Sequence, residues 1–273
     1  MSLKADIRIA VTSRSFSKNQ ILRNELLSKY KNVTFNDQGL KLNGDSLVAF
    51  LKGHNKAIIA LETINESILS QLPELKVVSK YGVGLDMIDI TSLSKYGVRL
   101  GWKGGVNKRS VAELVLSFAI MLLHRIPCAM EQVKRGDWFQ VIGRQLSGST
   151  IGVIGCGHIG QDVIKLLAPY KCKILSYDIL DFPSFYKKYN VEPVKLEDLL
   201  QRSDVITLHL PFNESTENIL DFDMLSLIKK EAVLINLARG GLIDEVELKS
   251  RLVKRTLFGA ALDVFSVEPP IDT

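Results

Sequence analysis

A glycine-rich segment at positions 151–160, Ile-Gly-Val-Ile-Gly-Cys-Gly-His-Ile-Gly, constrains the fold of this 273-residue chain more than any other feature. It contains Gly-x-Gly-x-x-Gly directly after a short apolar run and at the start of a helical stretch, as dinucleotide-binding turns do. Gly155 permits the tight turn, Gly157 lets the backbone approach a pyrophosphate, and Gly160 allows the helix to pack closely on the strand. The segment therefore predicts a strand–turn–helix unit that binds a dinucleotide. Incidental glycines in an ordinary turn are the alternative.

An acidic residue at the expected distance favours the dinucleotide. Asp178 ends the next apolar run, Lys173–Tyr177, and follows Gly160 by about 18 residues, close to the spacing of the ribose-binding acid in such folds. A carboxylate there accepts hydrogen bonds from the adenosine ribose hydroxyls and repels a 2′-phosphate. We therefore expect NAD rather than NADP as the cofactor.

Short β-rich runs alternate with longer helical stretches along the chain, which predicts an α/β fold with parallel sheets covered by helices. The stretch after Asn19 predicts a helix that includes Tyr30, and a long helix is expected from Asn107 to His124. The expected strands are 7–11, 57–60, 76–79, 98–100, 151–154, 174–177, 205–208, 233–236 and 259–264. A boundary near Gly104-Gly105 divides the chain into a smaller α/β domain, 1–104, and a nucleotide-binding domain, 105–273.

Composition limits the partners that this chain can have. Lys and Arg exceed Asp and Glu by only 35 to 30, and the surplus is not gathered into a basic tract, so we expect no nucleic-acid partner. The four histidines have no cysteine or acidic partner at ligand spacing, which argues against a metal. The three cysteines show no Cys-x-x-Cys spacing and fit a reducing compartment.

The apolar segments do not predict a membrane protein. The first six residues lack the apolar run of a signal peptide. The most apolar helix, 111–123, contains Glu113 and is too short to span a bilayer. We therefore expect a cytoplasmic protein without a membrane partner.

A second informative stretch, residues 234–244, reads Leu-Ile-Asn-Leu-Ala-Arg-Gly-Gly-Leu-Ile-Asp. A strand that ends in Asn-x-Ala-Arg-Gly-Gly puts Arg239 at the carboxyl edge of a parallel sheet, where ligands bind. A guanidinium can hold a carboxylate by two hydrogen bonds and polarise the adjacent carbonyl. Downstream, Glu268 follows the strand expected at 259–264. A surface ion pair for Arg239 and a solvated loop acid for Glu268 are the plainer alternatives.

The order of these motifs resembles that of a known family. Ser-Val-Ala-Glu on the long helix, Gly-x-Gly-x-x-Gly, Leu-His-Leu-Pro, Asn-x-Ala-Arg-Gly-Gly and Leu-Asp-Val-Phe with Glu-Pro-Pro occur at 110–113, 155–160, 208–211, 236–241 and 262–270. They are similar to those of NAD-dependent D-2-hydroxyacid dehydrogenases. From about Val77 to its end the chain resembles this family in its motifs, and before that only in its α/β pattern. The resemblance implies a Rossmann doubly wound parallel sheet and a smaller flavodoxin-like α/β substrate domain.

The resemblance also implies roles for individual residues. Arg239 would bind the carboxylate and 2-oxo group of a small 2-hydroxy or 2-oxo acid, and Glu268 would raise the pKa of a proton-transferring histidine. Backbone N–H groups of Val83 and Gly84 would meet the substrate carboxylate, although a plain glycine-rich turn is the alternative there. The cofactor would contact Gly155, Gly157, His158, Ile159, Gly160, Asp178, Leu210, Leu237, Ala238 and Asp263.

Two departures from the family pattern bear on the function. The catalytic histidine of the family lies in a Pro-His motif past Thr273, as does the helix that completes the first domain, so we expect the native chain to extend beyond Thr273. Relatives that act on 3-phosphoglycerate carry a basic residue where this chain has Glu62, which argues against a bulky phosphorylated substrate. Lys80, Lys103 and Arg109 are candidates to compensate for that charge.

The leading interpretation is an NAD-dependent enzyme that interconverts a D-2-hydroxy acid and its 2-oxo acid, similar to phosphoglycerate dehydrogenase. An NAD(H)-sensing, co-repressor-like binding protein and a truncated inactive paralogue are the alternatives. The long helix 107–124 is apolar on more than one face, and the resemblance puts it at a two-fold interface, so we expect a homodimer. A buried helix between domains would explain the same pattern.

Overall fold

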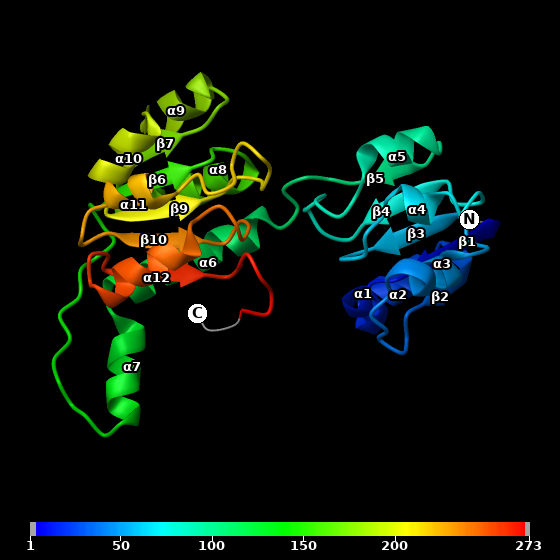
Figure 1. Cartoon of the computed structure of the whole chain (residues 1–273), viewed down its shortest axis with the longest axis horizontal. Coiled ribbons are helices and arrows are strands. Elements are labelled where there is room, and N and C mark those ends of the chain that lie inside the picture. The colour runs from blue at the N-terminus through cyan, green and yellow to red at the C-terminus, as the bar shows by residue number, and fades with distance from the viewer. Residues whose placement is uncertain (1–3, 271–273) are drawn as a thin grey trace. The chain divides into compact units, whose positions relative to one another are not determined.

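The computed structural model describes residues 4–270 and separates into two compact units, Met1–Val106 and Asn107–Thr273. Each unit is a parallel sheet with helices packed on it (Figure 1). Within residues 4–270 no single helix is long and apolar enough to cross a membrane. Helices α6 (Lys108–Leu123) and α7 (Ile126–Lys134), bent by 62° at the break between them, together meet that test on length and composition alone.

The first unit has five parallel strands in the order β2-β1-β3-β4-β5, which is the flavodoxin-like order. Its strands are β1 (Lys4–Val11), β2 (Tyr30–Phe35), β3 (Lys56–Ile59), β4 (Val77–Lys80) and β5 (Arg99–Gly101). Its helices are α1 (Arg14–Lys18), α2 (Gln20–Leu27), α3 (Gly44–Leu51), α4 (Glu66–Leu69) and α5 (Ile90–Lys95). Side chains from β1, β3 and β4 meet apolar residues of α3, α4 and α5 in its larger core cluster.

The second unit has six parallel strands in the order β11-β10-β9-β6-β7-β8, which is the Rossmann order. Its strands are β6 (Thr150–Ile154), β7 (Lys173–Tyr177), β8 (Val191–Pro193), β9 (Val205–Leu208), β10 (Val233–Asn236) and β11 (Gly259–Leu262). Its helices are α6 (Lys108–Leu123), α7 (Ile126–Lys134), α8 (His158–Leu167), the 3₁₀ helix η1 (Ala168–Tyr170), α9 (Pro183–Tyr189), α10 (Leu196–Arg202), α11 (Phe222–Ser226) and α12 (Glu245–Val253).

Alternate residues of the central strands of the second unit supply two cores. Val153 and Ile235 belong to a cluster with side chains of α6 and α8, whereas Ile154 and Leu234 belong to a cluster with side chains of α10 to α12. Both faces of the sheet are therefore covered, which explains why its central strands are apolar without polar alternation. The predicted fold class is confirmed for both units.

Four elements differ from the sequence-based expectation: helices α2 and α7 and strands β2 and β8. Helix α2 ends at Leu27, and Tyr30 begins strand β2 instead of continuing the helix. The short edge strand β8 and helix α7 were not expected. The chain breaks between α6 and α7 at Arg125, which has a positive φ of 56°. Pro127 lies in the first turn of α7, where a proline is tolerated, and the expected end of the long helix at His124 agrees with this break.

Candidate functional site

The glycine-rich turn joins β6 to α8 at the centre of the second sheet. Gly155 has a φ of 97°, and its N–H donates to the carbonyl of Tyr177 at 2.8 Å. A Cβ atom on Gly155 would lie 2.8 Å from the carbonyl oxygen of His209. The turn therefore requires glycine here for its backbone conformation and for its close approach to the end of β9.

The other two glycines of the motif have different surroundings. A Cβ on Gly160 would lie 2.1 Å from the Gly155 carbonyl oxygen, so this position packs the helix onto the turn. A Cβ on Gly157 would meet no atom within 4 Å, and both Gly157 and His158 are exposed. Open space directly above a helix start fits a bound pyrophosphate. Residues 155–160 therefore fit the dinucleotide that the sequence predicts.

Asp178 lies at the carboxyl end of β7 and is tied to the same turn. Its Oδ2 accepts a hydrogen bond from the Cys156 N–H at 2.6 Å, and its Oδ1 accepts one from the Leu180 N–H at 2.8 Å. These bonds fix the carboxylate beside the glycine turn, where a ribose hydroxyl can donate to it. Sequence reasoning missed the contribution of Cys156, because a backbone donor carries no side-chain signal.

Two buried polar side chains, Cys156 of the turn and Tyr186 of α9, interact with each other. Cys156 is buried, and burial raises the pKa of its thiol. Tyr186 on α9 is also buried, and burial raises its pKa to about 12. Both side chains are therefore neutral near pH 7, and they add no charge near the glycine turn.

His209 and Leu210 follow β9 on the other side of the switch point. The Nε2 atom of His209 lies 3.1 Å from the hydroxyl of Thr207, and burial of the ring lowers the pKa of His209 to about 3. Its Nδ1 atom is buried and has no hydrogen-bond partner among residues 4–270. An imidazole that stays neutral down to this pH is unsuited to act as a general acid.

Arg239 is set in place by the side chain of Asn236, the last residue of β10. The buried Asn236 amide donates to the carbonyl of Arg239 at 2.8 Å and accepts from the N–H of Ala238 at 3.0 Å. The Arg239 Nη1 atom donates to the carbonyl of Ala238 at 2.7 Å, and Leu237 and Ala238 are buried. This turn holds the guanidinium at the carboxyl edge of the sheet, on the edge that carries the glycine turn.

The segment after β11 packs against the same turn. A Cβ on Gly240 would lie 2.0 Å from the carbonyl oxygen of Phe265, so glycine is required for this approach. Glu245 at the start of α12 accepts from the N–H of Ser266 at 2.7 Å and from its hydroxyl at 2.9 Å. Asp263 donates its N–H to the carbonyl of Asn236 at 3.1 Å. Arg239 and Asp263 therefore belong to one local assembly, and Glu245 is a supporting residue that sequence reasoning missed.

Glu268 is exposed and bonds to its own turn. Its Oε1 atom accepts from the N–H of Phe265 at 3.1 Å. Among residues 4–270 its carboxylate forms no hydrogen bond with a histidine. The side chain closes the 265–268 turn, and its role toward an acid–base group stays a prediction.

The expected substrate loop of the first unit follows β4. The indole of Trp102 donates to the carbonyl of Val83 at 3.0 Å and holds the loop. Among residues 4–270, neither the Val83 N–H nor the Gly84 N–H donates to another protein group. Two backbone donors are therefore available to an anion.

The three cations considered as compensation for Glu62 have different positions. The Lys80 ammonium contacts the carbonyl of Ala60 and the sulfur of Met87. Arg109 on α6 forms an ion pair with the buried Asp162 of α8, with Nε 2.9 Å from Oδ2. Lys103 forms no ion pair within the described residues. Lys80 and Arg109 thus serve local packing.

Metal-binding side chains are not clustered in the part of the chain that the structure describes. Within residues 4–270, no group of three or more His, Cys, Asp or Glu side chains is arranged to hold an ion.

Comparison with known proteins agrees with this geometry. Residues 116–273 match the family profile described as D-isomer specific 2-hydroxyacid dehydrogenase, NAD binding domain. The chain is 34% identical to hydroxypyruvate reductase of Thermotoga maritima, over 85% of this chain and 76% of that protein. It is 34% identical to D-3-phosphoglycerate dehydrogenase of Methanocaldococcus jannaschii, over 85% of this chain and 45% of that one. This chain thus spans less than half the length of the second relative.

A solved structure shares the architecture. D-lactate dehydrogenase from Aquifex aeolicus, complexed with NAD and lactic acid, superposes with a TM-score of 0.82 at 26% identity. The superposition covers 94% of this chain and 77% of that one.

Proposed function

Since this chain belongs to the D-isomer specific 2-hydroxyacid dehydrogenase family, we propose that it interconverts a D-2-hydroxy acid and its 2-oxo acid with NAD(H). The observation that carries the proposal is the Asn236–Arg239 turn. It presents a guanidinium on the sheet edge that also carries the glycine turn. A protein that only binds the dinucleotide has no need for a carboxylate-binding group at that edge.

Residues 116–273 form the NAD-binding domain of this family. The pyrophosphate would lie over Gly157, with His158 and Ile159 beside it, and the adenosine ribose would donate to Asp178. When bound, NAD(H) exchanges a hydride with C2 of the substrate. The two backbone bonds to the Asp178 carboxylate hold its negative charge where a 2′-phosphate would be repelled, which supports NAD over NADP.

Arg239 would bind the substrate carboxylate and polarise the 2-oxo group as negative charge develops on its oxygen. The free N–H groups of Val83 and Gly84 would donate to a substrate carboxylate. Glu268 would accept a hydrogen bond from the acid–base histidine and stabilise its protonated form, so raising its pKa. Asp263 would face the nicotinamide carboxamide, and Leu210, Leu237 and Ala238 would line the cofactor.

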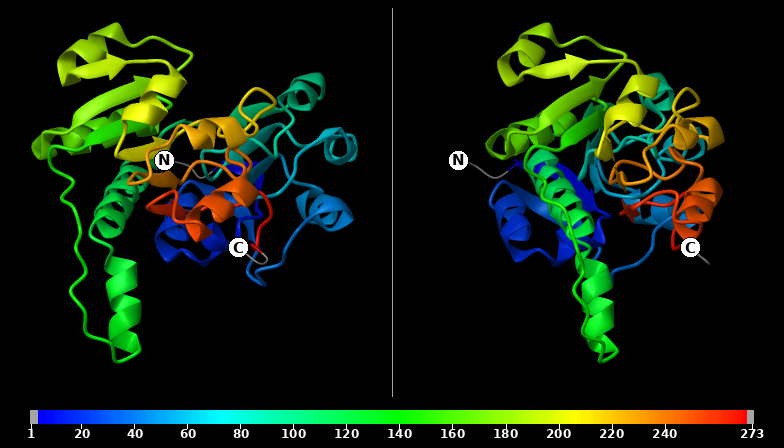
Figure 2. Two further views of the ribbon diagram at one scale, coloured as in Figure 1. Left: turned by 60° about the vertical axis from the view of Figure 1, so that its left-hand side comes forward. Right: turned by 90° about the vertical axis from the view of Figure 1, so that its left-hand side faces the viewer.

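The proposal extends to a cytoplasmic homodimer without nucleic-acid or membrane partners. Helix α7 and the extended segment after it project from the second unit (Figures 1 and 2). They expose apolar side chains that a dimer would bury: Met130, Val133, Trp138, Phe139 and Ile142. A double substitution, Trp138→Ser with Ile142→Ser, should convert a dimer to a monomer in light scattering. A wild-type protein that is already monomeric at micromolar concentration would exclude the dimer.

The test is NADH oxidation with a panel of 2-oxo acids: glyoxylate, pyruvate, hydroxypyruvate and 3-phosphohydroxypyruvate. We expect turnover with at least one of them and a loss of about 100-fold in kcat/KM in Arg239→Gln, because charge-assisted bonds to a carboxylate contribute about 3 kcal/mol. Arg255→Gln, an exposed arginine, is the matched control. NADH binding without oxidation of any substrate would favour a dinucleotide sensor and overturn the enzyme.

A further inference from the structure

A pocket of about 780 Å³ opens at the carboxyl edge of the sheet in the first unit. Its walls are the segments that follow four strands: residues 13–18 after β1, 40–43 after β2, 60–63 after β3, and Tyr81 after β4. In the order β2-β1-β3-β4-β5, strand β2 lies on one side of β1 and strand β3 on the other. The strand order therefore reverses at β1, and β1 and β3 flank the switch point. Doubly wound sheets bind ligands at this point, outside the carboxyl ends of the strands.

The pocket carries an excess of positive charge that comes from separate connections. Arg14, Lys18 and Lys41 line it and are exposed. Within residues 4–270, none of these three side chains forms an ion pair or a hydrogen bond with another residue. Three cations that converge without a partner at one cavity repel one another, so an anion that enters is favoured.

The single acidic residue in the lining, Glu62, is already engaged by the backbone. Its Oε2 atom accepts from the N–H of Ala60 at 2.7 Å, which closes the turn after β3. The lining therefore has three cations to one carboxylate. From the sequence, the negative charge of Glu62 argues against a phosphorylated substrate. In the structure this carboxylate is held in its own turn by the N–H of Ala60.

Hydroxyl donors and an aromatic wall complete the pocket. The hydroxyls of Ser13 and Ser15 lie 3.3 Å apart, and Ser15 and Thr63 are exposed in the lining. The ring of Tyr81 packs edge-on against Phe16, with centroids 5.3 Å apart, so this wall is fixed by the core. Hydroxyls, ammonium groups and a guanidinium are the donors that bind phosphate oxygens in proteins.

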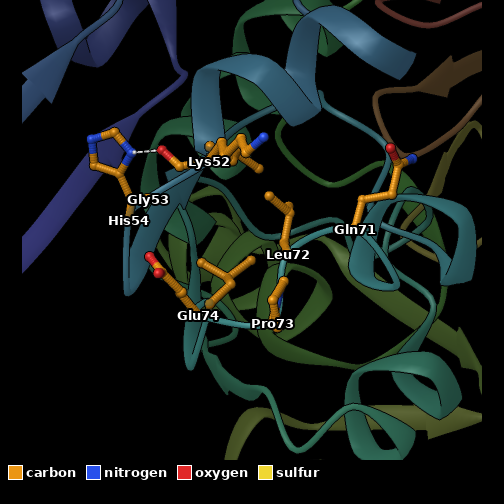
Figure 3. A pocket seen from close by; sticks show the side chains of 9 residues that line it. Lys52, Gly53, His54, Gln71, Leu72, Pro73 and Glu74 are labelled. Carbon is orange, nitrogen blue, oxygen red and sulfur yellow. Dashed lines mark hydrogen bonds between the residues drawn. The ribbon is translucent and has the colours of Figure 1, made fainter.

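A second pocket in the same unit is balanced in charge. This pocket, of about 310 Å³, lies before β3 and β4, at the amino edge of the sheet (Figure 3). It carries the cation Lys52 and the acid Glu74, and Glu74 already pairs with Arg8 at 2.9 Å. It also lies on the edge where parallel sheets do not bind ligands.

We propose that the switch-point pocket binds the phosphate dianion of a small phosphorylated molecule. Arg14 would hold two phosphate oxygens through its planar fork, with Lys18 and Lys41 neutralising the charge and Ser15 and Thr63 donating hydroxyls. The site lies within the first unit and needs no hydride transfer. Two sources share this chemistry: a phosphoryl group on the substrate itself, or a separate phosphorylated ligand.

The test is a titration of the ¹⁵N-labelled protein with inorganic phosphate, followed through backbone amide resonances. We expect saturable shifts at Ser15, Thr63 and Tyr81, distinct from any shift at Gly157 on the dinucleotide turn. The triple variant Arg14→Gln, Lys18→Gln, Lys41→Gln should bind at the pocket about tenfold more weakly or not at all. All three positions are exposed, so the variant should keep the wild-type spectrum elsewhere.

A matched control removes the same charge from the same unit. Lys31→Gln, Lys52→Gln, Lys76→Gln changes three exposed lysines outside the pocket and should leave the phosphate shifts unchanged. Equal weakening in both triple variants would reduce the effect to net charge and overturn the site. An absence of saturable shifts at the three pocket amides would overturn it as well.

Two further titrations distinguish the sources. If 3-phosphohydroxypyruvate shifts both the pocket and the Val83–Gly84 loop, and inorganic phosphate competes with it, the phosphoryl group belongs to the substrate. If hydroxypyruvate shifts the loop while phosphate still binds the pocket unhindered, the ligand is separate. These readouts do not depend on NADH oxidation, so a failure of the dehydrogenase assay leaves them interpretable.

Discussion

The Asn236 amide holds the backbone of the turn that carries Arg239. It donates to the carbonyl of Arg239 and accepts from the N–H of Ala238, and it is buried. Its position was visible in the sequence as part of Asn-x-Ala-Arg-Gly-Gly, but its two-sided bonding was not. The bonds explain why the amide, with one donor and one acceptor, suits this position better than a carboxylate of the same shape.

Asn236→Asp tests this explanation. The substitution replaces the donor to the Arg239 carbonyl with a second acceptor, so it should destabilise the fold by about 2 kcal/mol in urea unfolding. It should also lower kcat/KM about tenfold, with the affinity for NADH little changed, because the turn loses its shape. Full activity and stability in the variant would mean that the backbone holds the turn unaided.

His209 gives the fold a defined pH dependence. Burial lowers its pKa from 6.5 to about 3, so between these values the unfolded chain binds a proton that the folded chain excludes. The stability contributed by the neutral ring is present above pH 6.5 and is lost as pH falls toward 3. Between pH 7 and pH 5 this loss should be about 2 kcal/mol.

The measurement is urea unfolding at both pH values in the wild type and in His209→Gln, whose amide can still reach the Thr207 hydroxyl. The difference between the two proteins isolates the histidine from the other titrating groups. If both lose the same stability between pH 7 and pH 5, the buried histidine is not the cause.

At the scale of elements, two glycines of the β6–turn–α8 unit have different roles: Gly160 allows close packing, and Gly157 leaves open space. Gly160→Ala should lower the free energy of unfolding by about 2 kcal/mol or more, because its Cβ would lie 2.1 Å from the Gly155 carbonyl oxygen. Gly157→Ala should leave stability within about 0.5 kcal/mol of the wild type, since its Cβ meets no atom.

Gly157→Ala, the variant expected to keep its stability, should lose affinity for NADH. A methyl group at position 157 occupies the space proposed for the pyrophosphate, so NADH affinity measured by fluorescence should fall about tenfold or more. An unchanged NADH affinity in the stable Gly157→Ala protein would place the dinucleotide elsewhere.

Helices α6 and α8 are linked by the Arg109–Asp162 ion pair, in which the carboxylate is buried and the arginine half-exposed. Arg109→Met should cost about 2 kcal/mol of stability, because it leaves a buried carboxylate unpaired. Adding Asp162→Asn should recover most of that loss. Additive losses in the double variant would show that the two side chains do not interact.

The elements divide into those that sequence could predict and those that it could not. Strands β6, β7, β9 and β10 were predicted to within a residue, because a strand buried on both faces is a continuous apolar run with polar residues at its ends. Tyr30 was assigned to a helix because its spacing from Leu26 and Leu27 fits a helical face. Pairing of β2 with β1 overrides that local pattern, and a long-range pairing leaves no local signal.

The same division holds for the site. The need for glycine at positions 155 and 160 could be predicted, because backbone conformation and close packing restrict the residue type there. The roles of Gly157 and Asp178 toward a cofactor stay predictions. The bond from Cys156 to Asp178 and the contact of Gly240 with Phe265 could not be predicted, since both arise from backbone atoms far apart in sequence. The switch-point pocket needed the strand order, which brings Arg14, Lys18 and Lys41 to one edge.

At the scale of the whole molecule, the two units use one physical rule. Each is a parallel sheet whose strand order reverses next to its first strand, and each gathers its polar and charged candidates at that edge. In the second unit the edge carries the glycine turn, Asp178 and Arg239, and in the first it carries the cationic pocket. Both proposed sites therefore lie at the same kind of sheet edge, each within its own unit.

The configuration of the reduced product tests the central claim most directly. The protein is incubated with NADH and the 2-oxo acid that supports the fastest oxidation, and the hydroxy acid formed is resolved by chiral chromatography. The account predicts the D isomer alone, at an amount equal to the NADH consumed. An L or racemic product, or NADH that binds and is never consumed with any 2-oxo acid, would contradict it.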